Sequence, residues 1–189
     1  MKRALKAKAG NSVRIIGGEY RSRVLHFPDL PGLRPTPDRV RETLFNWLGQ
    51  RLDGLVCLDA FAGSGALGFE AISRGAARVV MLESEREAFA ALRRNAEMLA
   101  AAGVEILRID ARSHLAGPGR IYDLIFLDPP FSSDLLAPTL ALAATRLAPG
   151  GRIYAEFPTP RPALLAPETF TVLRQGRAGR SHFCLLELA

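Results

Sequence analysis

Apolar runs alternate with amphipathic stretches along most of the chain. Four runs have the length of strands and each ends in an acid: Leu55–Asp59, Arg78–Glu83, Val104–Asp110 and Tyr122–Asp128. Leu55–Asp59 is uninterrupted before its acid, as is typical of a strand buried on both faces of a parallel sheet. The stretches between the four runs and after them predict helices, one ending near Ser73, one over Glu85–Ala102 and one over Ser133–Leu147.

The C-terminal part of the chain predicts three more strands. Pro149-Gly150-Gly151 should stop the preceding helix, and the strands follow at Arg152–Phe157, Phe170–Gln175 and Ser181–Glu187. The last two are expected to form an antiparallel pair. Strands alternating with helices predict a doubly wound, mostly parallel, seven-stranded α/β sheet of the Rossmann-like type.

The N-terminal segment has a different pattern. Val13–Gly17 and Arg23–Phe27 flank a turn and predict a small hairpin, and a proline-rich connector follows over Pro28–Pro37. Thr36 is expected to cap a helix that begins at Pro37 and reaches about Arg51, with an apolar face made of Val40, Leu44, Trp47 and Leu48. We therefore predict an extension over residues 1–36 and a main domain over 37–189.

Charge is distributed unevenly. The net charge is +6, but residues 1–41 hold ten Lys/Arg and three Asp/Glu, whereas the remainder holds fifteen and sixteen. The basic segment is either a solubilising tail or an arm that contacts phosphates, since such a field speeds encounter with nucleic acid. All three lysines lie in the first eight residues, which argues against a lysine-dependent phosphate loop or Schiff base in the domain.

Composition predicts a cytoplasmic protein. No apolar run approaches the roughly 20 residues of a membrane span, and no apolar segment behind the basic N-terminus suggests secretion. Cys57 and Cys184 lie in apolar runs, as buried thiols do in a reducing compartment, and their spacing suits no metal. We expect no metal cofactor.

A glycine-rich loop follows the first strand. Gly63, Gly65 and Gly68 form a G-x-G-x-x-G pattern, and Glu83 follows about twenty residues later, as also occurs in dinucleotide sites. Asp59 distinguishes the cofactors, because a carboxylate would repel a pyrophosphate but favour the ammonium and sulfonium groups of S-adenosylmethionine. We therefore predict S-adenosylmethionine, with Glu83 on the ribose hydroxyls, Asp110 on the adenine amine and Ala111 near the ring.

Asp128-Pro129-Pro130-Phe131 follows the fourth strand. Two prolines fix the backbone and leave carbonyl acceptors, so a carboxylate and a carbonyl can together satisfy the two donors of an amino group. Phe131 can stack on a base. The motif predicts methylation of an exocyclic amine, with Asp128 and the Pro129 carbonyl localising the lone pair of the nitrogen. Ordinary strand termination would explain the prolines but not the flanking acid and aromatic residue.

With these motifs in place, the chain resembles the bacterial 16S ribosomal RNA guanine-N2 methyltransferases of the RsmD type. The resemblance covers nearly the whole chain and is most specific at Arg14–Gly18 and Leu33–Asn46, with the Asp59–Glu70 loop, Asp128–Phe131 and Gly150-Gly151. It implies the class I methyltransferase fold, S-adenosylhomocysteine as product, and a guanine of 16S RNA, within a 30S subunit or assembly intermediate, as substrate. We expect a monomer.

The predicted site residues form three groups. The catalytic group is Asp128, Pro129, Pro130 and Phe131. The cofactor group is Asp59, Phe61, Ala62, Gly63, Ser64, Gly65, Glu83, Ser84, Asp110, Ala111 and Asp128. The RNA group is Arg14, Arg21, Arg23, Arg34, Thr36, Arg39 and Arg41, some of which could instead close over the cofactor or cap and solubilise the helix.

Three alternatives remain open at this point. An N6-adenine methyltransferase would use the same Asp-Pro-Pro-Phe motif. A non-catalytic RNA-binding assembly protein could share the fold, although its motifs need not be intact. An NAD-linked oxidoreductase would share the glycine pattern, but Asp59 and the absence of a lysine-based catalytic pair argue against it.

Overall fold

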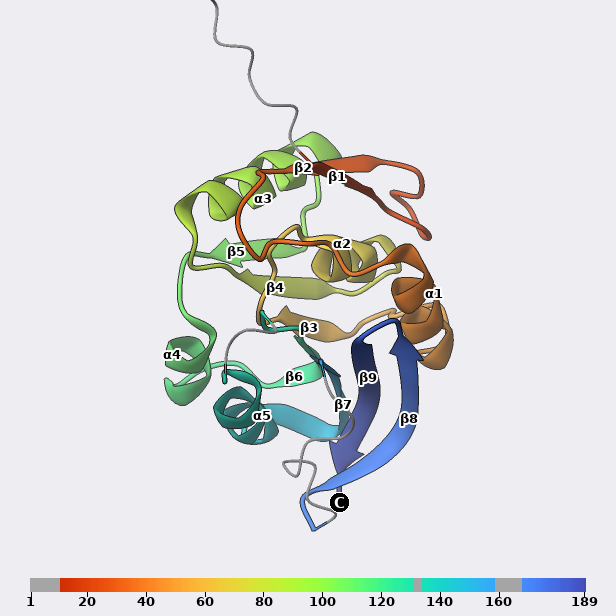
Figure 1. Ribbon diagram of the computed structural model, residues 1–189, viewed down its shortest axis with the longest axis vertical. Coiled ribbons are helices and arrows are strands. Elements are labelled where there is room, and N and C mark those ends of the chain that lie inside the picture. Colours follow the sequence, from red (N-terminus) through yellow and green to blue (C-terminus); the bar gives the residue numbers. More distant parts are fainter. Residues whose placement is uncertain (1–10, 131–133, 159–167) are drawn as a thin grey trace, which may run out of the picture.

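The computed structural model describes residues 11–130, 134–158 and 168–189. Its centre is a seven-stranded sheet with the order β5-β4-β3-β6-β7-β9-β8, in which β9 runs in the opposite direction to the other six strands (Figure 1). The predicted mostly parallel α/β sheet is thus confirmed. The strands are β3 (Val56–Asp59), β4 (Arg78–Leu82), β5 (Val104–Leu107), β6 (Tyr122–Leu127), β7 (Leu147–Phe157), β8 (Phe170–Ala178) and β9 (Ser181–Leu188).

Helices cover both faces of the sheet, as the apolar strand runs predict. Along each central strand, consecutive side chains enter opposite cores, so that Phe126 packs on one side and Leu127 on the other. The first core receives α1 (Asp38–Trp47), α2 (Ala66–Ser73) and α3 (Arg86–Leu99), and the second receives α4 (Ala111–Ala116) and α5 (Leu136–Ala144).

The N-terminal hairpin forms a separate two-stranded sheet. Strands β1 (Asn11–Arg14) and β2 (Val24–Phe27) pair antiparallel, which confirms the predicted hairpin with shorter strands. It lies over α3 at the top of Figure 1, where the Asn95 side chain bonds both backbone groups of His26. Leu25 and Phe27 enter the first core. The boundary predicted at residues 36 and 37 stays a prediction.

Two local predictions were wrong. The helix expected over Ser133–Leu147 ends at Ala144 in the described part, and Pro149-Gly150-Gly151 lies inside β7 rather than ahead of it. The register between β6 and β7 shifts at this point, from Tyr122 opposite Leu147 to Leu124 opposite Arg152. An irregularity of this kind accommodates a proline within a sheet. Helix α4 was not predicted at all.

None of the helices in the described ranges is long and apolar enough to cross a membrane.

Candidate functional site

The glycine loop lies at the carboxyl end of β3, between two neighbouring strands. The Ala60 amide donates to the Phe126 carbonyl of β6, and the Ala62 amide to the Leu82 carbonyl of β4. Gly65 has φ +82°, and a Cβ there would come within 2.5 Å of the Phe69 ring. The backbone turn therefore requires glycine at this position.

Asp59 lies beneath this loop. Its carboxylate is 2% exposed and accepts hydrogen bonds from the backbone amides of Gly68, at 2.9 Å, and Phe61. Burial raises the pKa of this carboxyl to about 7, although the two amides lower it. Asp59 thus fixes the loop and the start of α2. Its direct contact with a cofactor stays a prediction.

Glu83 follows β4 and faces the same loop. One carboxylate oxygen accepts from the Gly63 amide at 3.0 Å, and the other from the Glu85 amide at 2.7 Å. Burial raises the pKa of this half-buried carboxyl. The bonded oxygens retain lone pairs, so the carboxylate can also accept from two adjacent hydroxyls.

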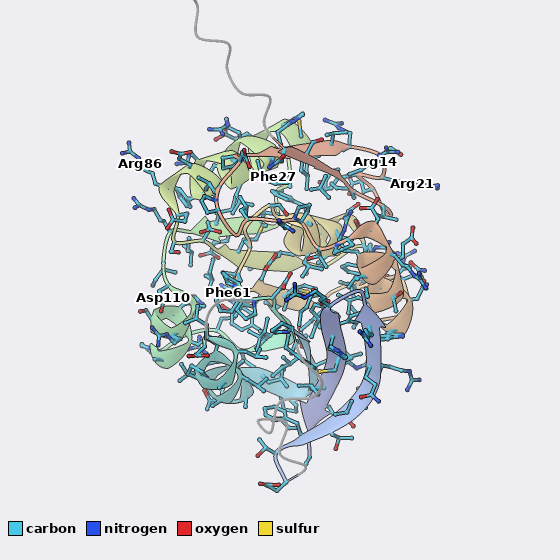
Figure 2. All side chains as sticks on the ribbon, in the orientation of Figure 1. Arg14, Arg21, Phe27, Phe61, Arg86 and Asp110 are labelled. Atoms are coloured by element: carbon cyan, nitrogen blue, oxygen red, sulfur yellow. The ribbon has the colours of Figure 1, made fainter. Side chains whose placement is uncertain are left out.

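The remaining cofactor candidates surround these two acids. Asp110 caps α4 by accepting from the Ser113 amide at 3.0 Å, so it has a structural function whatever else it binds. Phe61 and Asp110 lie on the same side of the molecule in Figure 2. Ala111 is buried at the first turn of α4, Ser84 is exposed, and the buried Ser64 hydroxyl accepts from the Ala66 amide.

Asp128 comes directly after β6, two strand positions beyond the Phe126 that pairs with Asp59. Its carboxylate accepts a 2.9 Å hydrogen bond from the Thr36 hydroxyl. Burial raises the pKa of Asp128 well above its ordinary value, and the Glu156 charge raises it further, whereas the Thr36 bond lowers it. Pro129 is buried and Pro130 exposed. Phe131 lies outside the described residues.

Glu156 was missed in the sequence. It lies near the end of β7 and is 4% exposed, and its carboxylate accepts from the Tyr154 hydroxyl, at 2.9 Å, and from the Ser181 hydroxyl. Burial raises its pKa. The signal was present, because the fifth parallel run, Arg152–Phe157, also carries an acid, one residue before its end.

The proline-rich connector passes over this edge of the sheet. A Cβ at Gly63 would lie 2.8 Å from the Leu33 side chain, and Thr36 reaches Asp128. The Thr36 cap prediction was wrong: Pro37 occupies the N-cap position of α1, and no side chain caps the helix. Thr36 is 7% exposed and its hydroxyl is bonded to Asp128, and its predicted contact with RNA or the cofactor stays a prediction.

The RNA prediction was wrong for Arg41. Its side chain is fully buried and forms ion pairs with Asp38, at 2.7 Å, and with Glu70, at 3.2 Å. It also donates to the carbonyls of Arg14 and Thr36. The guanidinium is enclosed and cannot reach a phosphate.

The other RNA candidates are exposed, but they do not surround one site. They are Arg14, Arg21, Arg23, Arg34 and Arg39. In Figure 2, Arg14 and Arg21 lie on the opposite side of the view from Phe61 and Asp110. The part of the basic arm in residues 1–10 lies outside the described residues.

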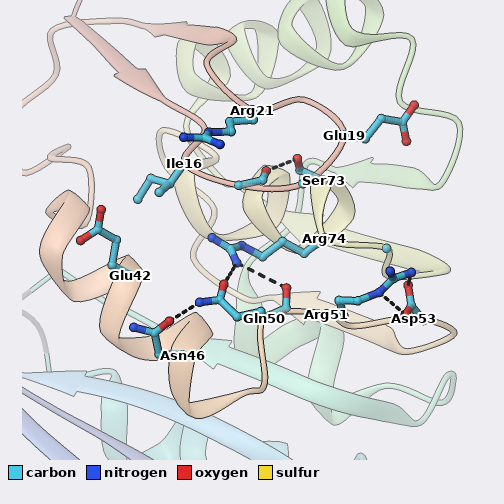
Figure 3. A pocket seen from close by; sticks show the side chains of 13 residues that line it. Ile16, Glu19, Arg21, Glu42, Asn46, Gln50, Arg51, Asp53, Ser73 and Arg74 are labelled. Atoms are coloured by element: carbon cyan, nitrogen blue, oxygen red, sulfur yellow. Dashed lines mark hydrogen bonds and ion pairs between the residues drawn. The ribbon is translucent and has the colours of Figure 1, made fainter.

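A cavity of about 720 Å³ lies beside α1 and the end of α2, away from the glycine loop (Figure 3). Arg74 reaches into it and bonds the Gln50 side chain, while its guanidinium lies 4.7 Å from the Phe45 ring centre and pairs with Glu70 at 2.8 Å. Arg51 pairs with Asp53. The charges in this cavity largely balance one another, unlike those at the end of the parallel strands.

Comparisons with known proteins place the chain in a family. The family model described as "Conserved hypothetical protein 95" matches residues 13–187. The chain is 42% identical to the "Ribosomal RNA small subunit methyltransferase D" of Escherichia coli K12 over 93% of this chain and 89% of that protein. It is 39% identical to the protein of the same name in Haemophilus influenzae, over 95% of each.

A solved structure shows the same architecture. The "Putative methyltransferase yhhF from Escherichia coli" superposes with a TM-score of 0.83 at 40% identity, covering 94% of this chain and 98% of that one. The chain is therefore a methyltransferase, and it belongs to the family described as conserved hypothetical protein 95, together with the ribosomal RNA small subunit methyltransferases D.

Proposed function

We propose that this protein transfers a methyl group from S-adenosylmethionine to the exocyclic N2 of a guanine in 16S ribosomal RNA. One observation carries the proposal: three buried or half-buried acids, Asp59, Asp128 and Glu156, end adjacent strands without an ion pair to any described arginine. Such an edge favours a cationic cofactor and a substrate rich in hydrogen-bond donors.

The cofactor fits the residues of this edge. S-adenosylmethionine, when bound, supplies an electrophilic methyl group on a positively charged sulfur. The raised pKa values of Asp59 and Asp128 reflect buried carboxyls whose charge has not been balanced, and a cation beside them would balance it. Glu83 would hold the ribose hydroxyls and Asp110 the adenine amine. No metal is needed in this proposal.

Asp128 and Pro129 would prepare the target amine. The amine lone pair is delocalised into the base, which makes the nitrogen a poor nucleophile. Hydrogen bonds from its two protons to the Asp128 carboxylate and the Pro129 carbonyl would localise the lone pair on nitrogen. Asp128 would then accept the proton that the methylated nitrogen releases. Positioning and electrostatics supply most of the rate under this arrangement.

The RNA substrate is proposed from the relatives and from charge. The curated relatives are named for ribosomal RNA of the small subunit. Exposed arginines of the hairpin and connector would contact phosphates, and the target base would be splayed out to reach Asp128, at a cost of a few kcal/mol. We propose that a monomer acts in the cytoplasm on a 30S subunit or an assembly intermediate.

A methyl-transfer assay tests this function. Tritiated-methyl transfer would be measured on naked 16S RNA and on 30S particles from cells lacking the enzyme, followed by identification of the labelled nucleoside. We expect N2-methylguanosine. N6-methyladenosine would favour the adenine alternative, and an absence of transfer to either substrate would contradict the proposal.

A further inference from the structure

Glu156 lies beside the proposed catalytic carboxylate. Leu127 and Ala155 are register partners on the parallel strands β6 and β7, so Asp128 and Glu156 are the next pair along, on strands about 4.8 Å apart. Two residues earlier, Phe126 and Tyr154 both enter the first core. Since side chains alternate between faces, Asp128 and Glu156 extend from that same face.

The Glu156 carboxylate is held firmly without being neutralised. The Tyr154 hydroxyl donates to one oxygen and the Ser181 hydroxyl to the other, which fixes the group between β7 and β9. Each oxygen keeps a further lone pair. No arginine in the described part of the chain pairs with it. The proposed mechanism makes no use of this buried carboxylate.

The Watson–Crick edge of the target base provides a donor for it. In guanine the 2-amino group adjoins N1–H, so two neighbouring donors face the same direction. In adenine the ring nitrogen beside the amine is an acceptor. Two adjacent carboxylates therefore complement guanine and oppose adenine.

We propose that Glu156 accepts the N1–H hydrogen bond of the target guanine and thereby selects guanine over adenine. This inference rests on the proposed function, because it presupposes that Asp128 binds the 2-amino group. Glu156 is then a specificity-determining residue. A base with an acceptor at N1 would lose this bond and place its lone pair against the carboxylate, and sites that bond a substrate N–H reject such analogues strongly.

Substrate RNA with 2-aminopurine at the target position tests the contact. This base keeps the 2-amino group but has an acceptor at N1. We expect wild-type kcat/KM for guanine to exceed that for 2-aminopurine by at least about a hundredfold. In Glu156→Gln, whose amide can donate to N1, we expect the guanine rate to fall and the ratio to drop below about ten. Glu87→Gln, at an exposed position of α3, should keep the wild-type ratio.

The outcomes separate the two proposals. A wild-type ratio below about ten, or a ratio unchanged in a folded Glu156→Gln protein, overturns the assignment of Glu156. A Glu156 that only orients Asp128 would slow both bases equally and leave the ratio unchanged. If Glu156→Gln does not fold, Ser181→Ala, which loosens the carboxylate, should still lower the ratio. If the wild-type product is not N2-methylguanosine, the proposed function itself fails, whatever the ratio.

Discussion

The fold buries two groups of charged side chains, and they differ in how their charge is balanced. Around α2, Glu70 is enclosed by Arg41 and Arg74 and accepts from the amides of Ile16 and Gly17. At the end of the parallel strands, Asp128 and Glu156 accept from hydroxyl donors, and no ion pair joins them to a cation among the described residues. We call these the Glu70 cluster and the acidic edge.

This difference indicates that the Glu70 cluster stabilises the fold, whereas the acidic edge can bind a ligand. A buried charge is tolerated when it is paired and bonded, and the Glu70 cluster meets both conditions within the protein. It ties the N-terminal extension to α1 and α2. The acidic edge meets them only in part, so its carboxyls have raised pKa values and remain available to a ligand. Both groups contain buried carboxylates, so it is the presence or absence of a paired cation, and not burial, that distinguishes them.

The largest effect should come from the Glu70 cluster. Arg41→Met replaces the guanidinium by an uncharged, unbranched side chain, so that Glu70 keeps only its ion pair with Arg74. We expect the free energy of unfolding to fall by about 3–5 kcal/mol. Urea denaturation would measure it. Arg39→Met, at an exposed position of the same helix, should change stability by less than about 0.5 kcal/mol. Equal losses in both variants would show that Arg41 is not a structural centre.

At the acidic edge, we expect a substitution to lower the rate of methyl transfer rather than the stability. Asp128→Ala is expected to lower turnover at least about a hundredfold, or ~2.7 kcal/mol, with nearly unchanged affinity for S-adenosylhomocysteine. Single-turnover methyl transfer and calorimetric titration would measure the two quantities. Full activity in this variant would refute the catalytic function of Asp128.

The pH dependence of the stability of Asp128→Asn tests whether the carboxyl of Asp128 is buried without a balancing charge. The folded pKa of Asp128 is raised, so the folded protein retains this proton at pH values where the unfolded chain has lost it. Wild-type stability therefore loses a contribution as pH rises from about 4, the ordinary pKa of an aspartic acid, toward the folded value. We expect the stability of Asp128→Asn relative to wild type to increase with pH over that interval. A relative stability that falls with pH would contradict this sign.

Thr36→Val should have a smaller effect. It removes the hydroxyl bond to Asp128 at nearly constant volume, and we expect turnover to fall about tenfold, or ~1.4 kcal/mol. Because the bond lowers the pKa of Asp128, its loss should move the acid limb of kcat/KM to higher pH. Glu156→Gln removes a negative charge and should move that limb to lower pH. If the acid limbs of Thr36→Val and Glu156→Gln shifted in the same direction, the prediction that the two residues have opposite effects on the pKa of Asp128 would be wrong.

The smallest effect concerns the exposed arginines. Replacing Arg14, Arg21 or Arg23 by alanine should leave stability within about 0.5 kcal/mol of wild type. Each lost phosphate contact should reduce the slope of log affinity against log salt by about 0.7–0.9. Filter binding to 16S RNA at several salt concentrations would measure it. An unchanged slope would favour the solubilising interpretation of the basic segment.

Sequence patterns predicted the sheet well because its central strands β3, β4 and β6 are mostly apolar and buried on both faces. The same reasoning placed Asp59, Glu83, Asp110 and Asp128 at one edge, since parallel strands end together. It misjudged Thr36 and Arg41, because their partners lie 92 and 29 residues away and local rules see only neighbours. A charged residue on a helix is usually exposed, and only the fold shows that Arg41 is buried and paired with Glu70.

The acidic edge is held by residues that precede and follow the parallel strands, which has a consequence for the order of folding during biosynthesis. Asp128 is bonded by Thr36, which precedes the whole main sheet, and Glu156 by Ser181 from the last strand. A nascent polypeptide still lacking that final strand has neither the hydroxyl that fixes Glu156 nor the strand that flanks β7. The acidic edge is therefore complete only after β9 has paired with β7, and under the proposed function activity would report that this late strand has docked.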